Sequence, residues 1–131
     1  MQSSTNKCNE INWILKGQNR LTEMYSCMSA EVLVPEDKST SFNNELMDRF
    51  LKNEGKLIIV GQASSHCVNF SVRDIVEHWP KDCGKSFSDI VILKDCMSPV
   101  PGFESAEAEF FKDMENLGCT VCTSEEFMAK W

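Results

Sequence analysis

Two short runs of uninterrupted apolar residues constrain the fold of this chain more than any other feature. They are LIIV at 57–60 and IVIL at 90–93, and both are rich in β-branched residues. A continuous apolar run of this length is typical of a strand buried on both faces, as strands are in a parallel sheet. The sequence therefore predicts buried strands over 57–60 and 90–93.

Amphipathic patterns surround these two runs. Apolar residues at helical spacing predict helices over 42–51, 67–78 and 106–117. Either Ser41 or Asn43 is a suitable cap for the first helix. Helices that alternate with buried strands indicate an α/β fold with a parallel sheet and right-handed crossovers.

The pattern of apolar residues is less regular towards the two ends of the chain. A short strand is expected over 11–15, where β-branched and aromatic residues gather, and a long connection over 18–41, which shows no period. A last strand is predicted over 119–123, followed by a short helix capped by Ser124. The chain has 131 residues, which suits one domain rather than two.

Composition excludes several classes of partner. Twenty acidic residues against 13 basic ones give a formal net charge of −7, so nucleic acids and anionic membranes are not expected to bind. No apolar run approaches the roughly 20 residues of a membrane span. The polar N-terminus does not resemble a signal peptide, and the seven cysteines are an odd number. We therefore expect reduced thiols and a cytoplasmic location.

Cys67 is the strongest candidate for chemistry. It is expected in the first turn of the helix over 67–78, where free N–H groups and the helix dipole favour a thiolate and can hold an oxyanion. The alternative is a buried cysteine that acts as a small apolar residue. The neighbouring His66 could act as a base, but a structural or pocket-lining role is favoured, because adjacent helical residues point in different directions.

Three other positions leave alternatives open. Lys16 ends the expected first strand, where it could support a thiolate, bind an anion, or simply be solvated. Asp95 follows a buried strand and could join a site, although a role as cap of the next segment is favoured. Cys119 and Cys122 have the spacing of half a metal or redox motif, but on a strand residues three apart face opposite sides. No metal site is therefore expected in this chain.

The segment around Cys67 resembles the nucleophile segment of the isochorismatase-like cysteine hydrolases, in their nicotinamidase-like branch. It reads VGQASSHCVNFSVRDIV, an apolar strand followed by Gly-x-Ala-Ser-x-x-Cys-Val. The upstream LKGQNRLTEMYSCMSAEV is similar to the family's lysine segment, and ILKDCMSPVPGFE is similar to a later loop. The resemblance spans residues 13–127 and implies a three-layer, Rossmann-like parallel-sheet fold.

The resemblance also implies roles for single residues. Cys67 matches the family's nucleophile and Lys16 its catalytic lysine. Ala63 and Cys67 match the positions whose backbone N–H groups form the oxyanion hole. The peptide bond between Gln62 and Ala63 matches one that is cis in the family, and Tyr25 matches an aromatic wall of the substrate pocket.

This chain departs from the family before Lys16. The family's catalytic aspartate and its metal ligands, an Asp-x-His and a later His, precede the lysine, whereas residues 1–15 contain neither Asp nor His. The chain therefore reads as a partial domain, incomplete at its N-terminus, without a cofactor of its own. A full-length parent is expected to bind a divalent metal such as zinc. The strand over 11–15 is expected to be poorly anchored, and exposed apolar surface is expected to favour homo-oligomers.

Two functions follow from these patterns. The first is a cysteine amidohydrolase that cleaves a small amide, such as nicotinamide, to the acid and ammonia through a thioester on Cys67. The second is a catalytically inactive fragment or binding module that lacks the aspartate and the metal site.

Overall fold

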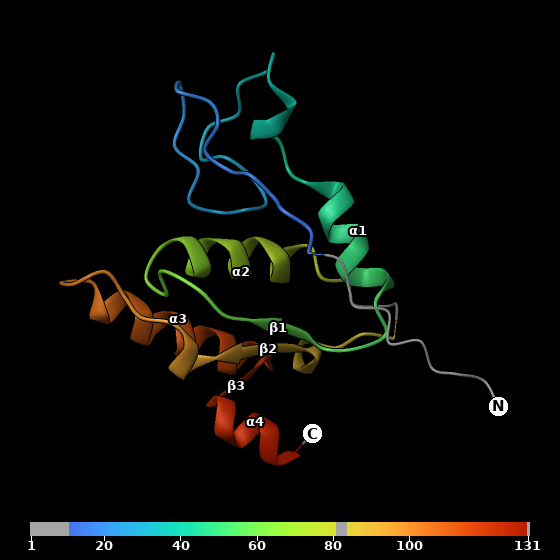
Figure 1. Ribbon diagram of the computed structural model, residues 1–131, viewed down its shortest axis with the longest axis vertical. Helices are drawn as coiled ribbons and strands as arrows, with labels where there is room; N and C mark the ends of the chain where they lie inside the picture. Colours follow the sequence, from blue (N-terminus) through green and yellow to red (C-terminus); the bar gives the residue numbers. More distant parts are fainter. Residues whose placement is uncertain (1–10, 81–83, 131) are drawn as a thin grey trace.

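The computed structural model describes residues 11–80 and 84–130 and confirms an α/β architecture. The predicted polar segment 1–10, with Cys8, lies outside the described residues. Four α-helices and one parallel three-stranded sheet occupy the described part of the chain, together with short 3-10 turns (Figure 1). The elements are α1 (Asn44–Lys52), β1 (Leu57–Ile59), α2 (Cys67–Glu77), β2 (Ile90–Leu93), α3 (Glu104–Leu117), β3 (Thr120–Cys122) and α4 (Ser124–Lys130).

The sheet has the order β1-β2-β3, so only β2 has a strand on each side. All four residues of β2 are buried, as its sequence predicts. The prediction that 57–60 is buried on both faces is wrong, because β1 lies at the edge and leaves Ile58 and Val60 exposed. Leu57 and Ile59 pack against the main core, whereas Ile58 points to the other face and lies outside the cluster of Val91, Leu93 and Phe127 there.

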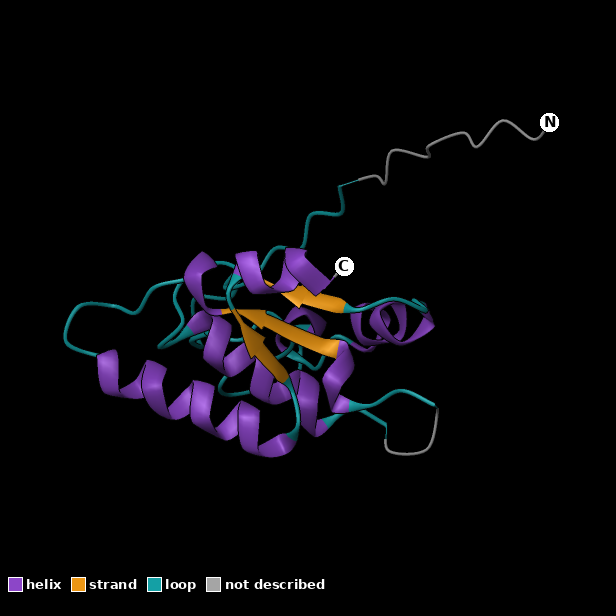
Figure 2. Cartoon of the chain, turned by 90° about the horizontal axis from the view of Figure 1, so that it is seen from below, coloured by secondary structure: helices purple, strands orange, loops and turns teal. Residues whose placement is uncertain are grey.

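Helices lie on both faces of the sheet (Figures 1 and 2). Ile90 and Ile92 of β2 point into the main core, which α1, α2 and α3 cover. Val91 and Leu93 point the other way and pack with Phe127 of α4. This alternation is the period of two that a strand imposes on its side chains. Within the described residues, no helix has the length and apolar character that crossing a membrane requires.

The predicted strand over 11–15 does not form. The segment has no ladder partner among the described residues, and all four of its apolar side chains are exposed. Its side-chain contacts include a hydrogen bond from Arg49 Nη1 to Asn12 Oδ1 of 3.2 Å. A strand needs a neighbour to satisfy its backbone, so β propensity alone does not form one here.

The connection over 18–41 has no strand or α-helix, as predicted, and contains the 3-10 turn Lys38–Thr40. It forms a lobe of loops beside α2 (Figure 1, blue to teal). Ala30 N donates to Thr40 O at 2.9 Å and Asn43 N donates to Met28 O at 2.7 Å. The buried Met28 side chain joins this lobe to the main core.

Caps define the helix ends. Asn43, one of the two predicted candidates, caps α1 by accepting a hydrogen bond from Leu46 N. Ser124 does not cap α4 as predicted, because it is the first helical residue. Thr123 is the cap instead, since its Oγ1 accepts a hydrogen bond of 3.1 Å from Glu126 N. Asp95 reinforces this end by accepting from Ser124 N and Ser124 Oγ, and these hydrogen bonds lower the pKa of its carboxyl group. The favoured role of Asp95, a cap for the segment that directly follows it, is therefore wrong, because its carboxylate binds the start of α4, 29 residues away.

Candidate functional site

Cys67 and Lys16 meet although they are 51 residues apart in the sequence. Cys67 is the first residue of α2, and Lys16 lies in the extended segment that crosses near this end of the helix. Lys16 Nζ lies 3.3 Å from Cys67 Sγ and also donates a hydrogen bond of 2.9 Å to Met24 O. The ammonium group is thus held directly beside the sulfur.

A cavity of about 390 Å³ lies beside this pair. Both Lys16 and Cys67 line it, together with residues of β1 and the apolar side of α2. No Asp or Glu side chain is among the described residues that line it. From residues 11–80 and 84–130, the cavity therefore has a thiol, a cation and apolar walls, but no carboxylate base.

The loop over 61–66 is anchored by the loop after β2. Gly61 N donates to Cys96 O at 3.1 Å, and Ser64 N donates to Ser98 O at 2.9 Å. Ser98 Oγ in turn donates to Gln62 Oε1 at 2.8 Å. Backbone and side-chain contacts thus fix the loop from which the oxyanion donors would project.

Glu107 of α3 is a second anchor of this loop. The fully buried Ser64 donates a hydrogen bond from Oγ to Glu107 Oε2. Sequence reasoning missed both Glu107 and Ser98, because their partners lie 43 and 36 residues away and no local pattern marks the contacts.

The backbone of the loop turns tightly around Ala63. Val68 N and His66 N both donate to Ala63 O, at 3.0 and 3.1 Å. The peptide bond between Gln62 and Ala63 is cis, at the position that the resemblance implies. The N–H groups of Ala63 and Cys67 donate to no acceptor within residues 11–80 and 84–130. Donors without a protein partner are what an oxyanion hole requires.

The two predicted pocket residues, Tyr25 and His66, do not line the cavity beside Cys67. Their ring centroids lie 5.6 Å apart, within an aromatic cluster that includes Phe70 and Phe103. His66 Nδ1 is 2.8 Å from Ser65 Oγ. The structure therefore brings Cys67 and Lys16 together and places Tyr25 and His66 in a neighbouring cluster.

Cys119 and Cys122 lie in separate cores on opposite faces of the sheet. Their thiols therefore diverge, as the strand geometry predicts. No group of three His, Cys, Asp or Glu side chains suited to a metal ion is present within the described part of the chain.

Burial raises the pKa of the Cys119 thiol to about 11. At pH 8 about one such thiol in a thousand is ionised, and the thiolate is the reactive form. We therefore expect iodoacetamide to label Cys119 more slowly than the exposed Cys96, with peptide mass spectrometry as the measurement. Unfolding should bring the two rates together, whereas equal rates in the folded protein would contradict the burial of Cys119.

Comparisons with known proteins leave the chain unassigned. No family model, no curated protein and no solved structure matches it. The geometry around Cys67 is therefore the basis for assigning a function.

Proposed function

We propose that this chain is a cysteine amidohydrolase with an isochorismatase-like domain and a small amide such as nicotinamide as its substrate. The contact of 3.3 Å between Lys16 Nζ and Cys67 Sγ carries the proposal. The arrangement of motifs around the two residues, which resembles that of the cysteine hydrolases, supports it. The described cysteines are free thiols, which fits a location in the reducing cytoplasm.

The proposed reaction begins with the ionised thiol of Cys67. Its sulfur attacks the carbonyl carbon of the amide, and the oxygen takes up the negative charge next to the N–H groups of Ala63 and Cys67. The C–N bond then breaks, and the nitrogen leaves as ammonia after it has gained a proton from solvent water, which also took up the proton of the thiol. Water hydrolyses the resulting thioester, which releases the acid and restores the thiol.

Lys16 has an electrostatic role in this scheme. Its ammonium group favours the thiolate and adds positive charge to the wall of the cavity. In the family that the motifs resemble, an aspartate takes the proton of the cysteine. A general base contributes typically 10²–10⁴-fold to such a step, so turnover by this chain is expected to be slow.

One observation favours a second candidate function, an inactive fragment or binding module. No carboxylate is present among the described residues that line the cavity with Cys67. In this alternative the cavity still binds small molecules, but the thiol does not attack them. The two candidates therefore differ in whether a covalent adduct forms on Cys67.

The proposal predicts that incubation with nicotinamide releases ammonia and leaves a nicotinoyl thioester on Cys67. Ammonia is measured with a coupled assay. The adduct is trapped by acid quenching and located by mass spectrometry of the peptide that contains Cys67. Because no carboxylate among the described residues lines the cavity to activate the water of the second step, the thioester is expected to persist long enough to be trapped.

Thiol labelling provides a test that can contradict the proposed amidohydrolase activity. In the active protein, a neutral alkylating reagent should modify Cys67 faster than Cys27, which lines the same cavity but has no lysine contact among the interactions of the described residues. Equal labelling of the two thiols, together with no adduct and no ammonia, would overturn the amidohydrolase and favour the binding module.

A further inference from the structure

The contact between Lys16 and Cys67 also brings an amine against a thiol, and this pair has a chemistry apart from amide hydrolysis. Lys16 Nζ lies 3.3 Å from Cys67 Sγ. Atoms that are placed to react with one another typically lie about 3–3.5 Å apart. The nitrogen and the sulfur are therefore close enough for a bond to form between them without a rearrangement of the backbone.

Hydrogen bonds hold the amine in this place. Lys16 Nζ also donates to Met24 O at 2.9 Å. Three residues after Met24, Cys27 N donates to Ser71 Oγ at 2.9 Å. Ser71 lies on α2 one helical turn after Cys67. The segment that contacts Lys16 is thus tied to the first turns of α2, which keeps Nζ beside Sγ.

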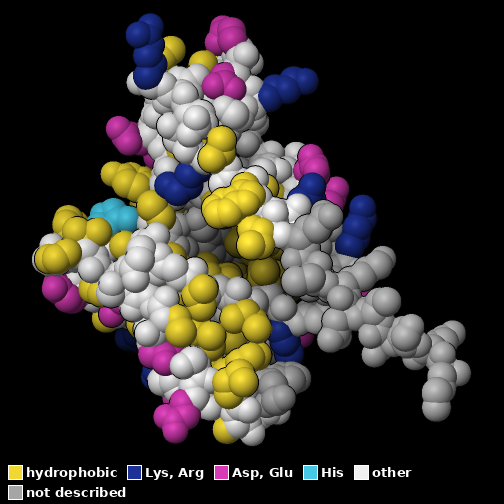
Figure 3. Space-filling view, in the orientation of Figure 1, with side chains coloured by type: hydrophobic (Ala, Val, Ile, Leu, Met, Phe, Trp, Pro, Cys, Tyr) yellow, Lys and Arg dark blue, Asp and Glu magenta, His cyan; other side chains and the backbone are white. Residues whose placement is uncertain are grey.

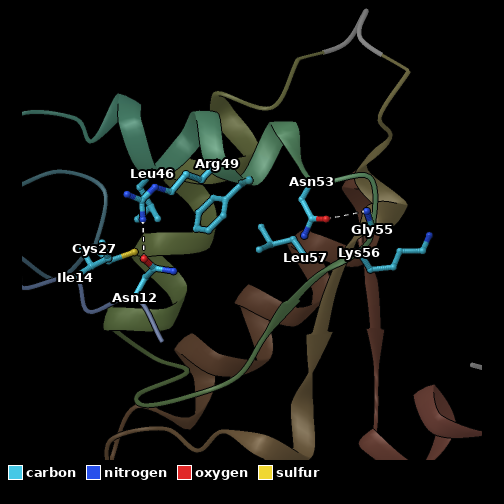
Figure 4. A pocket seen from close by; sticks show the side chains of 10 residues that line it. Asn12, Ile14, Cys27, Leu46, Arg49, Asn53, Gly55, Lys56 and Leu57 are labelled. Carbon is cyan, nitrogen blue, oxygen red and sulfur yellow. Dashed lines mark hydrogen bonds between the residues drawn. The ribbon is translucent and has the colours of Figure 1, made fainter. Parts of the chain in front are cut away.

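Lys16 is the nearest of the nucleophiles around the sulfur. It is the only side-chain amine among the described residues that line the cavity of about 390 Å³ beside Cys67. Cys27 lines this cavity too, and also the neighbouring cavity of about 420 Å³ between α1 and β1 (Figure 4). Among the interactions of the described residues, the Cys67 sulfur contacts Lys16 and not Cys27.

Other groups near the sulfur compete poorly with this amine. The walls of the cavity are mostly apolar, and apolar side chains gather around a hollow on one face of the molecule (Figure 3). An oxidised cysteine can also condense with a backbone nitrogen. The nitrogen that follows Cys67 belongs to Val68, and it already donates a hydrogen bond of 3.0 Å to Ala63 O. Attack by that nitrogen would break this contact at the start of α2.

We propose that hydrogen peroxide links Lys16 to Cys67 through a sulfenamide, a covalent bond between Nζ and Sγ. The sulfur first attacks one oxygen of the peroxide, and the O–O bond breaks. Cys67 becomes a sulfenic acid, and the hydroxide that leaves takes the thiol proton to form water. The neutral amine of Lys16 then attacks the sulfur, the S–O bond breaks, and the hydroxyl group leaves as water with a proton of the amine. The protein thereby loses two hydrogen atoms.

The two steps require an ionised thiol and a neutral amine, so alkaline solution favours the link. Near pH 9 an ordinary cysteine thiol is largely ionised, and about 4% of an ordinary lysine amine is neutral. Contact offsets this small fraction, because the amine does not have to diffuse to the sulfur. The linked sulfur cannot attack an amide, so the bond would also block the proposed reaction site. Its formation does not depend on amide hydrolysis.

Mass spectrometry of the peroxide-treated protein tests the proposal. After treatment of the folded chain at pH 9 and digestion, the peptides with Lys16 and Cys67 are expected to be joined and two hydrogen atoms lighter than their sum. Dithiothreitol attacks the sulfur and should separate them.

Two variants make the test specific. Lys16→Arg keeps the positive charge, but a guanidinium group stays protonated and cannot attack the sulfur. This variant should lose the linked pair and leave a sulfenic acid on Cys67 that dimedone traps. Lys112→Arg makes the same substitution at an exposed position on α3 and should keep the link.

Peroxide treatment in urea separates the effect of the fold from the reactivity of the thiol. Unfolding parts the two segments, so the linked pair should be lost while Cys67 is still oxidised. In the folded chain, a sulfinic acid on Cys67 without a link, or a disulfide between Cys27 and Cys67, would overturn the proposal. A link from Cys67 to another lysine in Lys16→Arg would do the same. None of these results depends on ammonia release, so the link and the amidohydrolase can fail separately.

Discussion

Replacement of Cys67 by alanine is expected to abolish ammonia release from nicotinamide. The substitution removes the sulfur that would form the thioester, and the only other contact of Lys16 Nζ among the described residues is Met24 O, a carbonyl oxygen that cannot replace the thiol. Loss of an attacking group typically lowers turnover by 10⁴-fold or more, which reduces a slow enzyme to the uncatalysed background. The rate of ammonia production at saturating nicotinamide is the measurement.

Two control variants make this experiment specific. Cys96→Ala removes an exposed thiol whose side chain lies outside the cavity, and it should leave the rate unchanged. Cys67→Ser keeps a polar side chain of similar size but a far weaker nucleophile, so it should be as inactive as the alanine variant. Ammonia release that persists in Cys67→Ala would remove Cys67 from the reaction.

Replacement of Phe110 by alanine is expected to have the largest effect on stability. Phe110 lies on α3, is fully buried, and packs in the main core that joins three helices to the sheet. Such truncations cost about 3–5 kcal/mol in the free energy of unfolding, because apolar burial is lost and a cavity remains. Since domains are stable by only about 5–15 kcal/mol, much of the total would be lost.

Urea unfolding followed by tryptophan fluorescence measures this effect, and the buried Trp79 of the same core provides the signal. Leu117→Ala is the matched control, because it lies on the same helix but is 46% exposed. We expect it to cost about 1 kcal/mol or less. A Phe110→Ala variant as stable as Leu117→Ala would show that α3 does not pack on the sheet as described.

The candidate site could be predicted from the sequence only in part. The position of Cys67 at the start of a helix follows from the apolar run before it and the helical spacing after it. The resemblance of motifs implied that Lys16 belongs to the same site, but no spacing gives a distance between residues 51 positions apart. The anchors Ser98 and Glu107 could not be found, because hydrogen bonds between distant segments leave no periodic signal.

Periodicity in the sequence by itself determined the α/β class, the buried strand β2 and the approximate extent of the helices, because apolar spacing reports which side of a local element is buried. The tertiary structure alone determined the exposure of β1 and the conformation of residues 11–15. β1 is half-exposed because Ile58 points away from the main core and lies outside the cluster that α4 covers, and residues 11–15 form no strand because they have no ladder partner among the described residues. A strand is completed by hydrogen bonds to another strand, so its own residues specify its tendency but not its partner. The same dependence on distant partners brought Lys16 to Cys67.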